Sequence, residues 1–317
     1  MGFESLLGND RLKANLAESL AKKHISHFYL ISGPEGSGKH TLAKLLAAAI
    51  LCQGKHKPCL SCTPCRKVMD GSHPDFITVD DPEKKTVTVD LIRQARADIY
   101  VQPNESDHKI YLFPRAQDMG LPGQNALLKV LEEPPKYGVF LLLTDNPDKL
   151  LPTVRSRCTE LKMQALREDI LRQQLRQDFP QAQEDDLTAA ISRSGGFLGQ
   201  ARELLKSGDQ LPPQTESFVK AFANRDAFLL MQTLVPMEKW KRDALADILT
   251  SWLELLESAM TSRSGIHAVS PHARQLAQLR TASELHDGAL ILKKAVDYTQ
   301  SNVSPAAVCG YLEWALR

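Results

Sequence analysis

Short apolar runs alternate with longer amphipathic segments over the first half of the chain. The apolar runs predict β-strands at 27–31, 75–79, 109–113, 139–144 and 159–163. Helical periodicity and helix-start signals predict helices at 6–24, 42–52, 91–95 and 118–133, with Asp90 as the cap of the third. The 139–144 run is apolar throughout, which predicts burial on both faces of a sheet. Strands that alternate with helices predict a parallel α/β sheet.

The pattern changes near residue 165, after which strand signals disappear. Residues 166–208 read as short helices that are interrupted at Ser194-Gly195-Gly196, and a polar link follows at 207–213. Beyond this link, the sequence predicts long amphipathic helices at 240–256 and 285–298. We therefore predict three domains, at 1–165, 166–208 and 209–317.

Composition and charge restrict the class of protein and its partners. The chain has 317 residues, of which 43% are hydrophobic and 24% charged, as in ordinary soluble globular proteins. Its net charge of +1 predicts that the chain alone is not a strong general binder of nucleic acid. No apolar run approaches the roughly 18 residues of a membrane span, and the N-terminus has no signal-peptide pattern. We therefore expect a cytoplasmic protein without a membrane partner.

A glycine-rich loop lies between the first predicted strand and the next helix. Residues 33–41 read Gly-Pro-Glu-Gly-Ser-Gly-Lys-His-Thr, which fits the phosphate-binding pattern GxxxxGK[ST] except directly after the lysine. Glycines in such a loop let backbone N–H groups surround a phosphate, and the lysine can reach the terminal phosphates. The candidate nucleotide-binding residues are Gly33, Gly36, Gly38, Lys39, His40 and Thr41.

The loop lacks the hydroxyl that binds Mg²⁺ in such sites. His40 stands in its place, and Mg²⁺ prefers oxygen ligands to imidazole. Thr41 comes one residue later, roughly 100° around the helix, and is poorly aimed at the metal. Mg²⁺ binding is therefore not expected, whereas ATP binding stays open.

A second feature argues against ATP hydrolysis. Nucleotide hydrolases carry an acidic residue at the end of a later strand, where it holds Mg²⁺ or activates water. The predicted strand at 109–113 is followed by Pro114 and Arg115 instead. Two independent losses of metal chemistry predict that the chain has no ATPase activity of its own.

Four of the six cysteines are bunched with the spacing C-x6-C-x2-C-x2-C, at Cys52, Cys59, Cys62 and Cys65. Such bunching in a reducing compartment favours a metal over disulfides, and four thiolates suit a structural, tetrahedral Zn²⁺. His56 lies within this loop and is the alternative ligand. Cys158 and Cys309 stand apart and read as packing residues.

Arg157 lies in Ser156-Arg157-Cys158, after the 139–144 strand. Taken alone, it reads as a surface ion-pair residue. It also completes an ordered set with the glycine loop, the cysteine cluster and the segment from Asn125 to Pro135. In this order the motifs resemble those of the bacterial clamp-loader ATPases of DNA polymerase III, over at least residues 1–205.

The resemblance implies an AAA+ P-loop domain with a parallel sheet and a zinc module at 52–65, then a helical lid and a helical collar that oligomerises. It implies a place in the DNA polymerase III holoenzyme beside gamma or tau and delta subunits, in a complex that uses ATP to load the sliding clamp onto primer–template DNA. Arg157 would then be an arginine finger that acts in trans on the ATP of a neighbouring subunit.

Three departures from the motor subunits of this family, gamma and tau, favour its non-motor, delta-prime class. His40 replaces a threonine, Pro114 and Arg115 replace an Asp-Glu pair, and Gly199 stands where a sensor arginine is expected. Thr144 matches the position of the first sensor. The resemblance therefore implies a stator that lacks ATP chemistry but completes a neighbour's site.

Other interpretations stay open at this point. The chain could be a gamma/tau-like motor in which Thr41 or water replaces the missing Mg²⁺ ligand, or a module that binds nucleotide without hydrolysis. Asn125 and Lys129 could contact the DNA backbone, or form a solvated helix face.

Overall fold

The computed structural model describes residues 2–81, 83–84, 86–207, 212–263, 271–301 and 303–316. The chain divides into two compact units. Unit 1 comprises Met1–Gln181 and Ser194–Glu203, and unit 2 comprises Ala182–Arg193 and Leu204–Arg317. Most of the expected polar link lies outside the described residues, at 208–211. The division into three domains stays a prediction.

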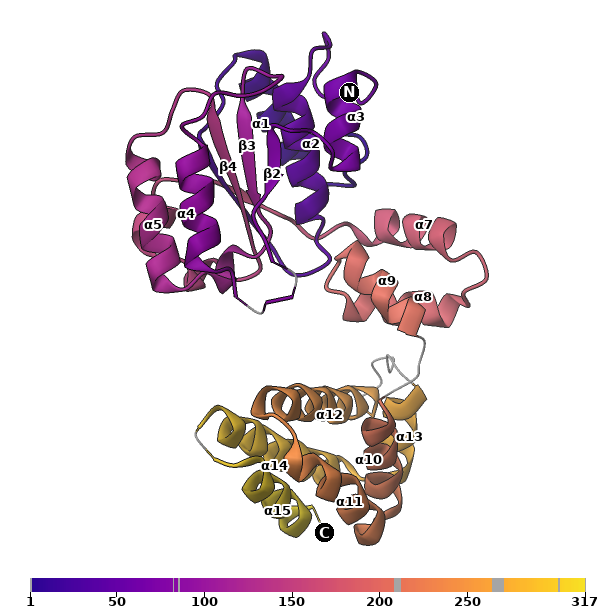
Figure 1. Ribbon diagram of the computed structural model, residues 1–317. Helices are drawn as coiled ribbons and strands as arrows, with labels where there is room; N and C mark the ends of the chain where they lie inside the picture. The colour runs from indigo at the N-terminus through magenta and orange to yellow at the C-terminus, as the bar shows by residue number, and fades with distance from the viewer. Residues whose placement is uncertain are drawn as a thin grey trace. The chain divides into compact units, whose positions relative to one another are not determined.

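Unit 1 is built on the parallel sheet that the apolar runs predict (Figure 1). Its strands are β1 (Phe28–Ser32), β2 (Phe76–Thr78), β3 (Lys109–Phe113), β4 (Gly138–Thr144) and β5 (Thr159–Lys162). They pair in the order β2-β3-β4-β1-β5, and every pairing is parallel. All seven residues of β4 are buried, as its lack of a polar face predicts.

Successive residues of a strand point to opposite faces of the sheet, and both faces are apolar here. Helices therefore cover both faces. Ile31 of β1 and Leu141 of β4 pack on one face against α1 (Asp10–Ala21), α2 (Lys39–Leu51) and α3 (Thr63–Asp70). Phe28 and Phe140 point to the other face, where their rings stack with centroids 4.6 Å apart. That face packs against α4 (Val89–Asp98) and α5 (Leu121–Glu132). The remaining helices of the unit are α6 (Pro152–Arg155), α7 (Glu168–Asp178) and most of α9 (Leu198–Ser207).

The structure differs from the sequence-based expectation at two places in unit 1. Asp90 does not cap α4, because the helix begins at Val89 and Thr88 is its N-cap. Helix α3 was not predicted, because most of its residues after Cys65 are polar. Cys62 precedes this helix and Pro64 lies in its first turn, where proline is well tolerated because that N–H has no helical partner.

The described residues of unit 2 form helices and their connections, with no strand. Its helices are α8 (Glu184–Arg193), α10 (Pro213–Asn224), α11 (Ala227–Leu234), α12 (Arg242–Arg263), α13 (Pro271–Leu279), α14 (Ala282–Gln300) and α15 (Pro305–Ala315). Trp252 of α12 is fully buried, stacks on Phe218 and donates its indole N–H to Thr215 at 3.0 Å. No helix among the described residues is long and apolar enough to cross a membrane.

Candidate functional site

The glycine loop has the strand–turn–helix setting that its sequence predicts. It follows β1 and ends where α2 begins at Lys39, with Gly38 as the N-cap. Gly36 and Gly38 have φ angles of 73° and 92°, in the left-handed region that glycine adopts without strain. The loop therefore brings backbone N–H groups and the positive end of α2 to one place, which suits an anion.

A cavity of about 950 Å³ opens beside this loop. Residues 35–41 line it, so the structure brings Gly36, Gly38, Lys39, His40 and Thr41 together, whereas Gly33 does not line it. Elements distant in sequence supply the rest of the wall, including Pro114, Arg115, Asp145, Gly199 and Arg202.

Lys39 is engaged within its own loop. Its ammonium group donates to the carbonyl oxygens of Gly33 at 2.6 Å and Pro34 at 2.8 Å. Partial burial lowers the pKa of Lys39, against the attraction of Asp145 and Glu35. These two contacts use two of the three N–H donors of the ammonium group, and one is left for a phosphate.

The start of α9 lies directly on the glycine loop. The backbone N–H of Gly199 donates to the carbonyl of Gly36 at 2.9 Å. A Cβ added at Gly199 would lie 2.4 Å from Cα of Gly36, so the position accepts no larger residue without a shift of backbone. An arginine at the expected sensor position would therefore not fit this arrangement. Arg202, one turn later, does line the cavity, but it is paired with Asp178 at 2.7 Å.

The position after β3 carries an ion pair. The guanidinium of Arg115 donates to Oδ1 of Asp80 at 2.6 Å and 3.2 Å, and to the carbonyls of Asp81 and Lys84. Asp80 follows β2, the neighbouring strand, which brings an acid to this edge of the sheet. Its carboxylate is held by Arg115. Asp145, directly after β4, is a further acid at the cavity that the sequence reading missed.

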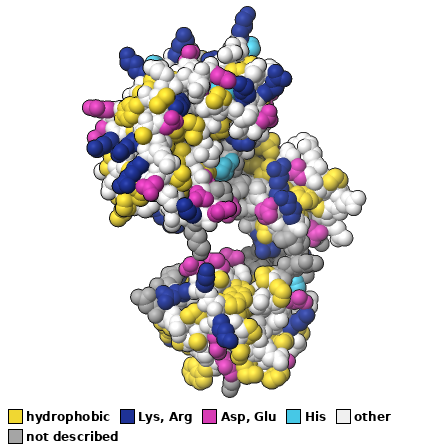
Figure 2. Space-filling view, in the orientation of Figure 1, with side chains coloured by type: hydrophobic (Ala, Val, Ile, Leu, Met, Phe, Trp, Pro, Cys, Tyr) yellow, Lys and Arg dark blue, Asp and Glu magenta, His cyan; other side chains and the backbone are white. Residues whose placement is uncertain are grey.

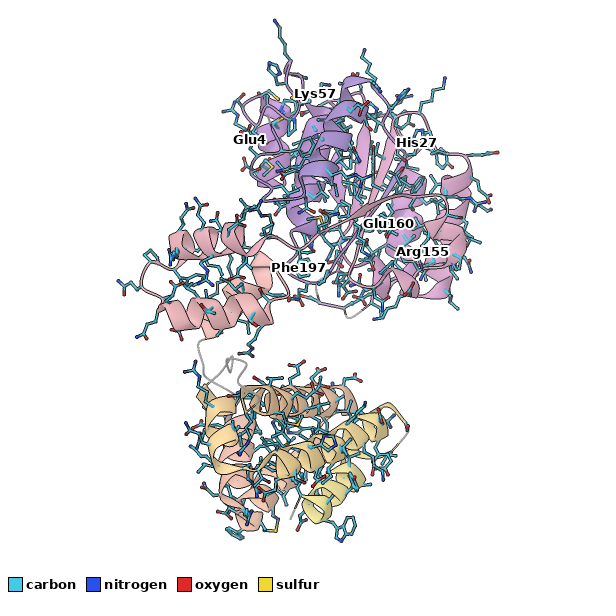
Figure 3. All side chains as sticks on the ribbon, turned by 180° about the vertical axis from the view of Figure 1, so that it is seen from behind. Glu4, His27, Lys57, Arg155, Glu160 and Phe197 are labelled. Carbon is cyan, nitrogen blue, oxygen red and sulfur yellow. The ribbon has the colours of Figure 1, made fainter. Side chains whose placement is uncertain are left out.

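Arg157 lies outside this cavity, on the surface after α6. Its side chain is 39% exposed, and its guanidinium contacts the carbonyl of Thr153 at 3.0 Å and Oε1 of Glu132 at 3.3 Å. Figure 3 labels Arg155, the last residue of α6, two residues before it. Cys158 packs against the apolar cluster beneath α5, as expected, and its thiol donates to the carbonyl of Val154. Burial raises the pKa of this thiol to about 12.

Gln124 is a residue of this region that sequence reasoning missed. It is 2% exposed, and its amide nitrogen donates to the carbonyls of Met119 and Lys149, while its oxygen accepts from the N–H of Leu151 at 2.7 Å. Gln124 therefore holds the segment that leads to α6 against α5. A polar residue flanked by helix formers gives no sequence signal for contacts that lie 25 and 27 residues away.

The four bunched cysteines form a second site. Their sulfur atoms all lie within 4.8 Å of one another, and Cys59 to Cys65 and Cys52 to Cys62 are each 4.0 Å apart. A tetrahedron of sulfurs around Zn²⁺, with bonds of about 2.3 Å, needs edges of roughly 3.8 Å, so the four residues fit such an ion. Hydrogen bonds from Ser61 and Cys62 lower the pKa of Cys59 to about 5, whereas burial raises the pKa of Cys52 and of Cys65. The exposed imidazole of His56 does not belong to this group of ligand atoms among the described residues.

Charge on the surface of unit 1 is mixed. Figure 2 shows basic and acidic side chains interspersed over its visible face. Asn125 and Lys129 are both exposed on α5, one turn apart. Contact of these two residues with DNA stays a prediction.

A family model described as "DNA polymerase III, delta subunit" matches residues 8–167, which include the glycine loop, the cysteine cluster and Arg157. Subunit tau of Bacillus subtilis DNA polymerase III is 36% identical over 158 residues, 49% of this chain and 28% of tau. Subunit delta' of the same organism is 36% identical over 157 residues, 49% of this chain and 47% of delta'.

The match in solved structures is weaker. A DNA polymerase III gamma subunit-related protein of Thermotoga maritima covers 97% of this chain and 100% of its own, with 17% identity and a TM-score of 0.41. This chain spans less than half the length of either Bacillus relative. Because the family model matches half of the chain, the protein belongs to the DNA polymerase III delta subunit family.

Proposed function

We propose that this chain is a non-motor subunit of the delta-prime class in the clamp loader of DNA polymerase III. It would not hydrolyse ATP itself, and it would offer Arg157 to the ATP of a neighbouring gamma or tau subunit. Sequence identity does not choose between the classes, since tau and delta' are each 36% identical to the chain over about half its length. The residues at the cavity and the surface location of Arg157 support the delta-prime class.

The observation that carries the proposal is the ion pair at the end of β3. A working site holds Mg²⁺ with carboxylates that are free to bind it. Here Arg115 occupies the position of an acid and engages Asp80 with two nitrogens. His40, next to Lys39, and the contact of Gly199 with Gly36 support the same conclusion.

The location of Arg157 on the surface supports a trans-acting role. It is exposed, and it is not directed into the cavity of its own chain. An arginine finger stabilises the charge that develops on the transferred phosphoryl group and is worth about 10³–10⁵ in rate. In this proposal, the chain offers the positive charge of Arg157 to a neighbouring gamma or tau subunit. The complex, which also contains a delta subunit, loads the clamp onto primed DNA.

ATP turnover by the purified chain tests the non-motor assignment. With MgATP, we expect the chain and its Lys39→Ala variant to show the same background rate. Turnover that Lys39→Ala abolishes would instead identify a motor in which Thr41 or water serves the metal.

A second candidate function is nucleotide binding without hydrolysis. The cavity of about 950 Å³ beside the loop amides favours it. Titration of a fluorescent ATP analogue into the chain, with Mg²⁺ and with EDTA, would separate this role from the first. Binding that is lost in Lys39→Ala, without turnover, would support it.

The cysteine cluster supports a structural metal site, and we propose Zn²⁺ as its ion. In this site Cys52, Cys59, Cys62 and Cys65 would fix the loop between α2 and α3. Metal analysis of the purified chain should find one Zn²⁺ per chain, and Cys62→Ser should lower that content. A full zinc content in Cys62→Ser, with loss in His56→Ala, would favour the histidine as a ligand.

A further inference from the structure

We propose that Glu132 is a positioning residue for Arg157, which it holds ready for a phosphate on another subunit. This inference rests on the proposed role of Arg157 as an arginine finger. It adds a second residue, on a different element, to the machinery that acts in trans.

Two contacts from different elements define the position of the guanidinium. Nη1 of Arg157 donates to the carbonyl oxygen of Thr153 in α6 at 3.0 Å. Nη2 donates to Oε1 of Glu132, the last residue of α5, at 3.3 Å. Thr153 lies four residues before the arginine, so its carbonyl holds the side chain close to its own turn. Glu132 supplies the contact that is distant in sequence.

These contacts leave most of the hydrogen-bonding capacity of the arginine available. A guanidinium has five N–H donors, of which the two contacts use one on each terminal nitrogen. Three donors remain, enough for two-point recognition of a phosphate. Glu132 therefore orients the guanidinium and leaves N–H donors available for the phosphate.

The helix that carries Glu132 is itself hydrogen-bonded to the segment before α6. Gln124, two turns earlier on α5, is buried and ties that helix to the segment before α6 through Lys149 and Leu151. The same helix thus fixes the segment at one point and contacts the guanidinium at another. An unrestrained arginine side chain samples many rotamers, and each restraint reduces the ordering needed when it meets its ligand.

The expected size of the effect is modest because the pair is exposed. The side chain of Glu132 is 57% exposed and that of Arg157 is 39% exposed. Exposed pairs of this kind correspond to a change of about 1.5- to 5-fold in an equilibrium or rate. We therefore expect Glu132→Gln to reduce the Arg157-dependent ATPase rate by about 1.5- to 5-fold.

The test is a double-mutant cycle in the reconstituted complex with its ATP-hydrolysing subunits and primed DNA. Glu132→Gln should lower kcat and leave KM for ATP unchanged, because the contact concerns the finger and not binding of nucleotide. The matched control is Glu133→Gln, which removes the same charge from the next exposed position and should retain the full rate. In an Arg157→Ala background, Glu132→Gln should cause no further loss, since the residue acts only through the arginine.

The outcomes separate this inference from the proposed function. If Arg157→Ala lowers the rate and Glu132→Gln does not, the positioning role is wrong and the finger stands. A loss in Glu132→Gln that is fully additive with Arg157→Ala, or that Glu133→Gln reproduces, also overturns it. No loss in Arg157→Ala overturns both.

Discussion

Asp75 is a fully buried carboxylate at the entrance to β2, where its surroundings favour the charged form. It accepts hydrogen bonds from the backbone N–H groups of Asn104, Glu105 and Ser106 at 2.6–3.0 Å. Burial raises the pKa of Asp75, but these hydrogen bonds together outweigh it and lower the pKa below the usual value. One side chain thus fixes the loop that precedes β3.

A carboxyl group with a lowered pKa in the folded state stabilises the fold when it is ionised. Its contribution is present above the unfolded pKa of about 3.9 and is lost as the pH falls below it, because folding then requires release of a proton. Asp75→Asn should lower the free energy of unfolding at pH 7 by roughly 3 kcal/mol. Urea unfolding at pH 7 and pH 3 checks this prediction, and the difference between wild type and variant should shrink at pH 3. A constant difference would contradict it.

Single residues were predictable where the chemistry is local. His40 after Lys39 and Arg115 after an apolar strand can be read from adjacent letters, and the structure places both at the cavity. The partner of Arg115 could not be read this way, because Asp80 lies 35 residues earlier and meets it only through strand pairing. The role of Gln124 could not be predicted either, because two of its backbone partners lie 25 and 27 residues away in the sequence.

At the scale of elements, the contact between the glycine loop and α9 depends on two glycines. Gly36 has a positive φ angle, which glycine adopts without strain. At position 199, only glycine fits against Gly36 without a shift of the backbone. Gly199→Ala should destabilise unit 1 by about 1–3 kcal/mol, because its Cβ would meet backbone and not a flexible side chain.

The matched control for Gly199→Ala is another helical glycine. Gly310 in α15 is exposed, and a Cβ added there meets nothing within 4 Å. Gly310→Ala should be stabilising by about 0.5–1 kcal/mol, because alanine loses less backbone entropy in a helix. Thermal unfolding followed by circular dichroism measures both. Equal shifts for the two variants would show that Gly199 is not in close contact.

The elements themselves were largely predictable. The five strands lie within about one residue of the apolar runs, because parallel strands buried on both faces leave a continuous apolar signal. Helix α3 was not predicted because its first three residues, 63–65, belong to the cysteine cluster, and the five that follow are too few to show a helical period. The packing of α9 on the glycine loop involves backbone atoms, which carry no side-chain pattern.

At the scale of the whole molecule, all three tryptophans lie in unit 2. Trp252 is fully buried, whereas Trp314 is 78% exposed. Tryptophan emission should therefore report on unfolding of unit 2 alone, while circular dichroism reports on both units.

A substitution confined to unit 1 tests that separation. Gln124→Leu leaves buried backbone groups without partners and should destabilise unit 1 by on the order of 3 kcal/mol. We expect the dichroism transition to shift to lower temperature while the emission transition stays in place. A parallel shift of both signals would show that the two units unfold together.

The central claim is that this chain lacks ATP chemistry and completes the site of a neighbour. The most direct test is the DNA-stimulated ATPase rate of the reconstituted complex that carries Arg157→Ala. The matched control is Arg155→Ala, a partly exposed arginine two residues away that is paired with Asp148 at 2.8 Å. We predict that Arg157→Ala lowers the rate of ATP hydrolysis at the neighbouring site by about 10³–10⁵-fold. The complex should then lose the turnover that this site contributes, whereas Arg155→Ala should retain the full rate. An unchanged rate in Arg157→Ala, or an equal loss in both variants, would contradict the account.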